Sequence, residues 1–364
     1  MQAFIVSNLD LKNGKLRLDS YLSAQLACSK NQIHHLIKAQ VVSINGVPCH
    51  KNGIYLKASD SVSIHLNTDG VDSINAANST DSIHTESKAL QAIMQHDARF
   101  KIDILHQDEH ILIINKPAHL IIHKAPSVKE PTLTDWLKSQ SHILHTLSGE
   151  ERYGIVHRLD KQTSGALAIA KSHLAYAALP KELKSREMGR YYLAIIDMPL
   201  QKNQQVSCYM GRAAHNRLKM SKIHIANNAP IPKGVRDSKS SFVKLATSNN
   251  GALELIAIKL HTGRTHQIRA HLESLSRHIL GDTLYGYKIS PKTHNYQDRI
   301  LLHAYILYLI HPQTQQKCTF KAPIALDMLE FIQTHFTKDL PDGCEDIMEL
   351  LEVDRIMGLF ECFS

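Results

Sequence analysis

The chain has 364 residues, of which 43% are hydrophobic and 21% are charged. That composition excludes wholesale disorder, and the length exceeds what one compact core usually holds, so we expect two or three domains. The first residues lack a charged stretch followed by an apolar one, and no apolar run approaches the roughly 20 residues of a membrane span, so we expect neither a secretory signal nor a membrane protein. Six scattered cysteines without a C-x-x-C pair favour free thiols in the cytoplasm.

Positive charge is concentrated in the body of the chain. The formal net charge is +8. The segment 337–364 holds eight acidic residues against two basic ones, so this tail carries −6 and the rest of the chain carries +14. A body this basic favours a polyanionic partner such as RNA or DNA.

The N-terminal segment, residues 1–66, has the pattern of a small module with two helices and a hairpin. Apolar residues at helical spacing predict a helix over 17–27, and a capping box starting at Ser29 opens a second helix. Asn45-Gly46 between two apolar runs predicts a tight hairpin, and residues 62–66 are expected to form a closing strand.

Three further segments follow this module. Residues 67–98 are expected to be a polar linker, because Asn, Ser, Thr and Asp dominate most of that stretch. Residues 99–336 alternate strand-like runs with amphipathic helices, which indicates an α+β domain around a largely antiparallel sheet. The expected strands are 111–115, 166–170, 191–196, 253–260 and 306–312, and the expected helices are 133–140, 173–185 and 265–275. The acidic tail, 337–364, is either a docking helix or disordered.

The densest group of polar residues is GIVHRLDKQTSGALAIA (154–170). Gly165 allows a tight turn into a strand, and the loop before it presents Asp160. If Arg158 and Lys161 hold this carboxylate, it stays ionised and can act as a nucleophile or general base. The alternative from the residues alone is a surface turn with an ordinary ion pair.

A second group lies in LHTGRTHQIRAHLESL (260–275). Arg264 comes just before a helix that begins near Thr265, at the end of the helix dipole where a cation is disfavoured. An anionic partner, either a carboxylate or a phosphate, would explain that position, and Arg269 adds a second cation about one turn later. No metal site is expected, because the histidine pairs at suitable spacing lack a third ligand.

Five sequence blocks between residues 99 and 325 resemble, in the same order, the motifs of the RluA family of pseudouridine synthases. They are HILIINKPAHLIIHKAP (110–126), HRLDKQTSG (157–165), REMGRYYLAII (186–196), TGRTHQIRAHL with ILGDTLYG (262–272 and 279–286), and RILLHAYILYLIHP (299–312). The N-terminal module resembles an RNA-binding fold named after a ribosomal small-subunit protein. The resemblance implies an α+β catalytic domain, with a mixed, largely antiparallel sheet flanked by helices, preceded by a helix-helix-hairpin RNA-binding module.

The resemblance also implies roles for individual residues. Asp160 would be the nucleophile, Arg264 would pair with it, and Tyr192 would stack on the uracil ring and assist a proton step. Arg190 stands where relatives often have a lysine, which keeps the charge. The resemblance further implies substrate binding by His157, Arg158, Arg299 and Leu302. Among these, Leu302 would pack against the base and Arg299 would help to hold the RNA.

The expected activity is therefore isomerisation of uridine to pseudouridine in RNA, which needs no cofactor. Large-subunit ribosomal RNA is the expected substrate, with transfer RNA as the alternative, and we expect a cytoplasmic monomer. Asp160 could attack the ribose anomeric carbon, abstract a ribose proton, or add to the uracil ring. Two other classes remain open: a non-catalytic RNA-binding protein, and a glycosidase-like hydrolase, which would need a second carboxylate near Asp160.

Overall fold

The structure of the chain, a computed structural model, describes residues 2–7, 16–25, 33–34, 37, 41–51, 53–64, 97–125, 128–140, 153–226, 229–338, 340, 344 and 346–363. These residues form two compact units, one before residue 93 and one after it. Most of the expected linker, residues 67–96, lies outside the described part of the chain. The boundaries expected for the segments stay a prediction.

The N-terminal unit contains a small sheet and a helix around an apolar core of its own. Its four-stranded sheet has the order β1 (Gln2–Ile5), β6 (Ser61–Ile64), β3 (Val42–Ile44), β4 (Val47–Pro48), and β2 (Leu16–Arg17) pairs with β5 (Tyr55–Leu56). Helix α1 (Leu18–Gln25) confirms the first expected helix. The β3–β4 hairpin confirms the expected turn, since Asn45 and Gly46 have positive φ values of 51° and 81°. The second expected helix lies mostly outside the described residues, and an RNA-binding role for this unit stays a prediction.

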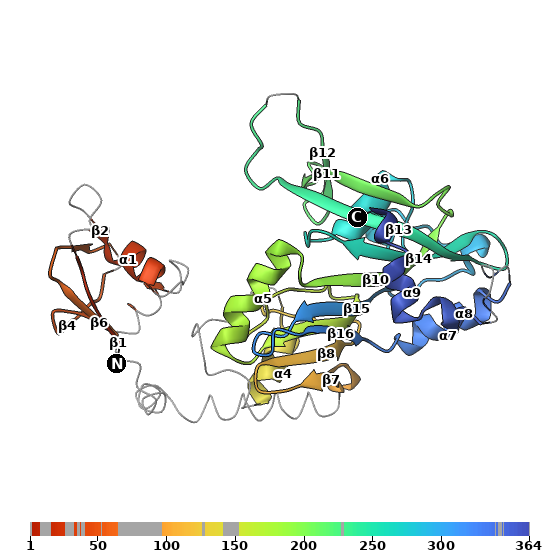
Figure 1. Ribbon diagram of the computed structural model, residues 1–364. Helices are drawn as coiled ribbons and strands as arrows, with labels where there is room; N and C mark the ends of the chain where they lie inside the picture. Colours follow the sequence, from red (N-terminus) through yellow and green to blue (C-terminus); the bar gives the residue numbers. More distant parts are fainter. Residues whose placement is uncertain are drawn as a thin grey trace. The chain divides into compact units, whose positions relative to one another are not determined.

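The second unit is built on one large twisted sheet (Figure 1). Its strand order is β12-β11-β13-β14-β10-β15-β9-β8-β7, with β16 also paired to β15. Every described pair in it is antiparallel except β9 with β15, so the expected mixed, largely antiparallel sheet is confirmed. The strands are β7 (Asp103–Gln107), β8 (Ile111–Lys116), β9 (Ser164–Ala170), β10 (Gly189–Asp197), β11 (Gln204–Arg212), β12 (Met220–Ile223), β13 (Arg236–Thr247), β14 (Leu253–Leu260), β15 (Leu302–Ile310) and β16 (Lys317–Lys321).

Short helices flank this sheet. All three expected helices are present, as α4 (Leu133–Ser139), α5 (His173–Ser185) and α6 (Gln267–Ser274). The others are α7 (Leu326–His335), α8 (Ile347–Leu350) and α9 (Val353–Gly358), with 3₁₀ turns η3 (Ala98–Phe100), η4 (Thr283–Tyr285), η5 (Pro291–Thr293) and η6 (Glu361–Phe363). In the described part of the chain, no helix has the length and apolar character needed to cross a membrane.

The central strand β10 separates two faces, because side chains alternate along a strand. Its odd-numbered residues, Tyr191, Leu193 and Ile195, belong to an apolar core that α7, α8 and α9 also line. The described part of the acidic tail is therefore helical and packed; for instance, Tyr305 donates a 2.6 Å hydrogen bond to the Leu351 carbonyl. The even-numbered residues of β10 point to the other face, where the candidate site lies.

Candidate active site

The Asp160 loop is held in place by its connection to β9. The Thr163 N–H donates a 3.1 Å hydrogen bond to the Asp160 carbonyl, which closes a turn. Gly165 then enters β9 at φ +115°, and a Cβ there would lie 2.2 Å from the carbonyl oxygen of Ala304 in β15. Only glycine fits this close approach. The β9–β15 pairing therefore sets the path of the loop that carries Asp160.

Asp160 is a partly covered carboxylate, 19% exposed, with two basic neighbours, one in helix α6 and one at the residue just before it. Arg269 Nη1 lies 3.5 Å and His266 Nε2 lies 3.8 Å from Asp160 Oδ2. The expectation that Arg158 and Lys161 hold this carboxylate is wrong: Lys161 instead binds Glu130 at 2.6 Å, and Arg158 is exposed. The counter-charge for Asp160 thus comes from a distant segment of the chain.

The expected pairing of Arg264 with Asp160 is also wrong. Arg264 donates to the carbonyl of Asp237 at 2.9 Å and to its carboxylate at 3.2 Å. Arg264 therefore has an anionic partner, as its position before α6 indicated. That partner is Asp237, an exposed residue of β13. The guanidinium beside Asp160 is Arg269, one turn further along the chain.

Asp282 holds Arg269 in position, and the sequence analysis missed it. Arg269 donates from Nε and Nη2 to the two Asp282 oxygens at 2.7 and 2.8 Å, a bidentate pair with both side chains buried. Burial opposes the charge of Arg269, but Asp282 and then Asp160 raise its pKa above the ordinary value. The guanidinium is thus fixed with one edge on Asp282 and the remaining nitrogen toward Asp160.

Tyr285 completes this side of the site. Its hydroxyl lies 3.0 Å from His266 Nδ1 and accepts a 2.8 Å hydrogen bond from the Met220 N–H in β12. Its ring lies beneath the Arg269 guanidinium, 4.6 Å from ring centroid to Cζ. Burial lowers the pKa of His266, while the charge of Asp160 opposes that shift. Tyr285 lies in the ILGDTLYG block, but its contacts could not be foreseen, because its partners are 19 and 65 positions away.

Tyr192 and Leu302 are buried residues of the neighbouring strands β10 and β15. Tyr192 is 4% exposed and pairs with Ala304 across β10 and β15, while Leu302 pairs with Ala194, two residues along. Burial raises the pKa of the Tyr192 phenol, and the nearby charges of Arg190 and Asp160 act on it in opposite directions. The structure therefore brings Tyr192 into electrostatic range of Asp160, and the role expected for Tyr192 beside the uracil ring stays a prediction.

Arg299 does not have the position expected for an RNA contact. It is 5% exposed and makes a bidentate pair with Asp327, and its Nη1 donates to the carbonyls of Ile300 and Gln162. Its donors are thus directed to the protein, and it ties β15 and α7 to the Asp160 loop. The expectation that its guanidinium holds RNA is wrong for this arrangement.

Lys116 also joins the Asp160 loop to a neighbouring strand, and the sequence analysis did not single it out. The ammonium is fully buried and donates to the carbonyls of Pro117, Leu120 and Lys161, the residue that follows Asp160. Burial lowers its pKa to about 7, while Asp160 works in the other direction. The N-K-P segment therefore fastens the end of β8 to the loop that carries the carboxylate.

Comparison with known proteins identifies the family of the chain. Residues 110–274 match the family model described as RNA pseudouridylate synthase. A Helicobacter pylori protein named uncharacterized RNA pseudouridine synthase is 42% identical over 94% of this chain and 95% of its own length. The chain belongs to the RNA pseudouridine synthase family. This synthase is also 34% identical, over 62% of its chain and 70% of the relative, to a Zymomonas mobilis protein named ribosomal large subunit pseudouridine synthase D.

The fold of the synthase also matches a solved structure. The human protein titled RNA Pseudouridylate Synthase Domain Containing 4 aligns with a TM-score of 0.50 at 21% identity, covering 69% of this chain and 96% of that one. The family assignment establishes an enzyme that forms pseudouridine in RNA.

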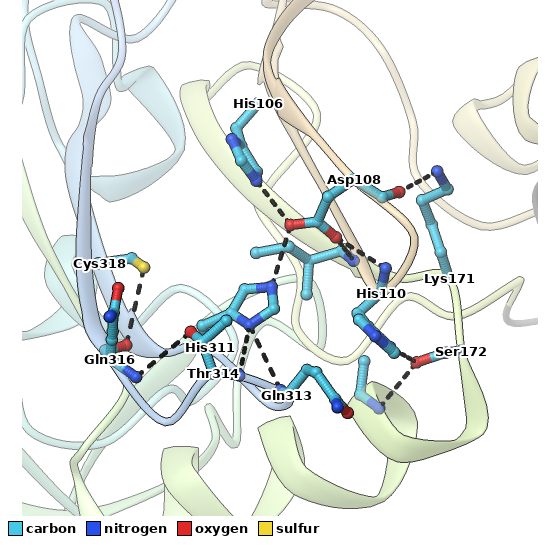
Figure 2. A network of polar contacts seen from close by, with 12 residues as sticks. His106, Asp108, His110, Lys171, Ser172, His311, Gln313, Thr314, Gln316 and Cys318 are labelled. Carbon is cyan, nitrogen blue, oxygen red and sulfur yellow. Dashed lines mark hydrogen bonds and ion pairs between the residues drawn. The ribbon is translucent and has the colours of Figure 1, made fainter.

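A second polar cluster of the synthase surrounds Asp108 at the far end of β8 and β9 (Figure 2). His106 and His311 approach one Asp108 oxygen at 2.7 and 3.0 Å, and Lys171 donates to the Asp108 carbonyl. His311 Nδ1 accepts from the Thr314 N–H at 3.1 Å, so its proton is on Nε2, which leaves no free lone pair for a metal. Within the described ranges, no group of side chains is arranged to hold a metal ion. This cluster joins the ends of strands and is structural.

Proposed function

We propose that this pseudouridine synthase modifies uridines of large-subunit ribosomal RNA, with Asp160 as the reacting carboxylate. The observation that carries the catalytic part is the Asp160–Arg269–Asp282 arrangement, which holds one partly exposed carboxylate next to a buried, fixed cation. The name of the Zymomonas mobilis relative supports the ribosomal target.

A basic surface adjoins this arrangement and would hold the RNA. The strands β11 and β12 and the connection to β13 carry exposed basic side chains, which suits contacts with phosphates. The base of β12 is joined to the site, because the Met220 N–H binds the same Tyr285 hydroxyl that contacts His266. The exposed basic residues are Arg212, His215, Arg217, Lys222, His224, Lys233 and Arg236.

The chemistry follows from what the isomerisation requires. The bond from the ribose to uracil N1 breaks, the base turns, and a new bond forms to C5, so no external reactant is consumed. The target uridine must leave its stack to reach Asp160, which costs a few kcal/mol that protein contacts offset. In this arrangement Arg269 orients Asp160, Tyr192 and Leu302 line the place of the base, and Arg158, exposed beside the loop, contacts the RNA.

The N-terminal unit would add affinity for RNA without taking part in the chemistry. It has a core of its own, separate from that of the second unit, so the two parts can act as linked modules. A protein that starts near residue 93 should therefore still isomerise uridine at saturating RNA, with weaker and less salt-dependent binding. A soluble, folded, inactive fragment would mean that the N-terminal unit belongs to the active site. The free thiols among the described cysteines fit a reducing compartment such as the cytoplasm.

The target can be tested by mapping pseudouridines in all RNA from cells with and without the gene. The proposal predicts that specific positions in large-subunit ribosomal RNA lose the modification, and that the full chain restores them. Restoration should fail with Arg212, Arg217 and Lys222 changed together to Gln, but not with the same change at three exposed lysines far from β11 and β12. If only transfer RNA positions disappear, the ribosomal target is wrong while the activity stands.

A further inference from the structure

Four Lys or Arg side chains are buried in the described part of the synthase, and one of them, Arg190, has neither a carboxylate partner nor acceptors for all of its donors. Arg269 and Arg299 each bind a carboxylate with two hydrogen bonds, and Lys116 donates to three carbonyl oxygens. Arg190 is 6% exposed, and no carboxylate of the described residues lies within ion-pair distance of it. An uncompensated buried cation is strongly unfavourable, so its presence calls for a reason.

The contacts of Arg190 leave most of its hydrogen-bonding capacity unused. Its Nη1 lies 2.9 Å from His157 Nδ1, and its Nε is buried without an acceptor. The His157 ring also accepts the Ala168 N–H at Nε2, 2.9 Å away. A neutral imidazole accepts at only one nitrogen, so it cannot satisfy both donors. Burial, and then the charge of Arg190, hold the pKa of His157 well below its usual range. The imidazole is therefore a neutral neighbour of Arg190 and does not compensate its charge.

Arg190 lies on the catalytic face of β10. It is two residues before Tyr192 in the same strand, so both side chains project to the face opposite the apolar core. His157 belongs to the Asp160 loop, and Arg190 Nη2 lies 3.1 Å from the point where a Cβ on Gly263 would stand. The guanidinium is therefore placed between the Asp160 loop, Tyr192 and the segment that leads into α6.

The reaction moves a negative charge toward this region. If Asp160 bonds to C1′, the electron pair of the C1′–N1 bond leaves with the base, so uracil becomes the anion and Asp160 an ester. If Asp160 removes the ribose 2′ proton, a glycal forms and uracil again leaves with the pair. If Asp160 bonds to C6, the C5–C6 π pair moves onto the ring and its O4. By each route Asp160 loses its charge and the uracil ring gains it, until closure at C5 and loss of the C5 proton reverse the transfer.

We propose that Arg190 is the cation that stabilises the anionic uracil ring during isomerisation. Arg269 neutralises Asp160 before the transfer, and Arg190, left without a carboxylate, is ready for the charge after it. Because the guanidinium is already in place, the protein does not have to rearrange when the anion forms. Charges fixed in advance in this way stabilise a transition state most effectively. The inference rests on Asp160 as the reacting carboxylate, but not on the identity of the RNA.

The test compares Arg190→Gln, which removes the charge, with Arg190→Lys, which keeps it. The control is Lys259→Gln, which removes a cation from the adjacent strand on the opposite face, where Lys259 covers the Tyr191 ring. The substrate is total RNA from cells that lack the gene, grown with or without 5-fluorouracil, so that every candidate uridine is present in both forms. Fluorine at C5 withdraws electrons and stabilises the base anion by itself, so the enzyme's cation matters less.

Single-turnover rates are measured with excess enzyme by mass spectrometry as the loss of the starting uridine or 5-fluorouridine, because the fluorinated base has no C5 proton to lose after it rejoins the ribose. RNA binding is measured separately. Arg190→Gln should slow uridine conversion on the order of 10²- to 10³-fold, as loss of one oxyanion donor does in other enzymes. It should leave RNA binding unchanged and show at least a tenfold smaller defect with 5-fluorouridine. Arg190→Lys should recover most of the rate, and Lys259→Gln should match the wild type.

Equal defects of Arg190→Gln on both substrates would overturn the proposal and indicate a structural role, as would Arg190→Lys being as slow as Arg190→Gln. An Arg190→Gln protein that does not fold would likewise show that the residue serves the fold. Failure of the Asp160 assignment looks different, because Asp160→Asn would then retain activity whatever the result at Arg190.

Discussion

The assignment of Arg269, rather than Arg264, as the partner of Asp160 makes a sharp prediction about two arginines five residues apart. Arg269 has a side chain 7% exposed and is paired with Asp282, which is 1% exposed. Changing Arg269 to Gln leaves the Asp282 carboxylate buried and unpaired, which should lower the free energy of unfolding by about 3–5 kcal/mol. Arg264 is 28% exposed and its partner Asp237 is 76% exposed, so Arg264→Gln should cost only about 0–1 kcal/mol.

The assay is urea unfolding of both variants, followed by pseudouridine formation under conditions where each is folded. Arg269→Lys separates stability from catalysis, because it keeps the charge but loses the two-pronged contact that aims the guanidinium. It should fold and bind RNA, yet form pseudouridine on the order of 10²-fold more slowly. If Arg264→Gln proves the more damaging change to either property, the arrangement described around Asp160 is incorrect.

Three other predictions concern separate parts of the chain. Gly165→Ala would place a Cβ 2.2 Å from the Ala304 carbonyl oxygen, so this variant should be strongly destabilised or fail to fold. Gly251 also has a positive φ, but a Cβ there would meet no atom within 4 Å, so Gly251→Ala should lose only about 1 kcal/mol of unfolding free energy in the same urea titration. The Arg17 guanidinium holds the pKa of the buried Asp19 at about 2, below its usual 3.8, so the ionised Asp19 contributes stability on the order of 2 kcal/mol. This contribution is present above pH 4 and is lost as pH falls toward 2. The difference in unfolding free energy between wild type and Asp19→Asn should therefore close over that window, and a constant difference would argue against this pair. Tyr192→Phe should reduce turnover more than RNA affinity, because the ring remains for stacking when the hydroxyl is removed; equal losses would mean that the hydroxyl mainly contacts RNA.

The regular elements of the catalytic unit could be predicted because their signals are local. The apolar run 253–260 and the amphipathic run 173–185 coincide with β14 and α5, since alternation and helical spacing are written in neighbouring residues. Asp160 could be singled out for the same reason, because a polar loop with a turn glycine is visible in one short stretch.

The partners of Asp160 could not be predicted, because they depend on tertiary packing. Arg264 attracted attention through the helix dipole, but its anion is Asp237, 27 positions upstream. Arg269 reaches Asp160 only because α6 packs beside the loop, and it stays in place only because Asp282 faces it. The buried positions of Arg190, Lys116 and Arg299 have the same origin: nothing in a sequence distinguishes an arginine on a sheet surface from one beneath a loop.

The central claim is that the carboxylate of Asp160 performs the isomerisation, and Asp160→Asn tests it most directly. Asn keeps the shape of the side chain but lacks the anionic oxygen that attacks or abstracts a proton. Purified wild type and variant are compared on RNA from cells lacking the gene, with pseudouridine quantified by mass spectrometry and RNA affinity measured in parallel. The account predicts that the variant binds RNA with nearly wild-type affinity and forms no pseudouridine. Pseudouridine formation above a trace by the purified variant would contradict it.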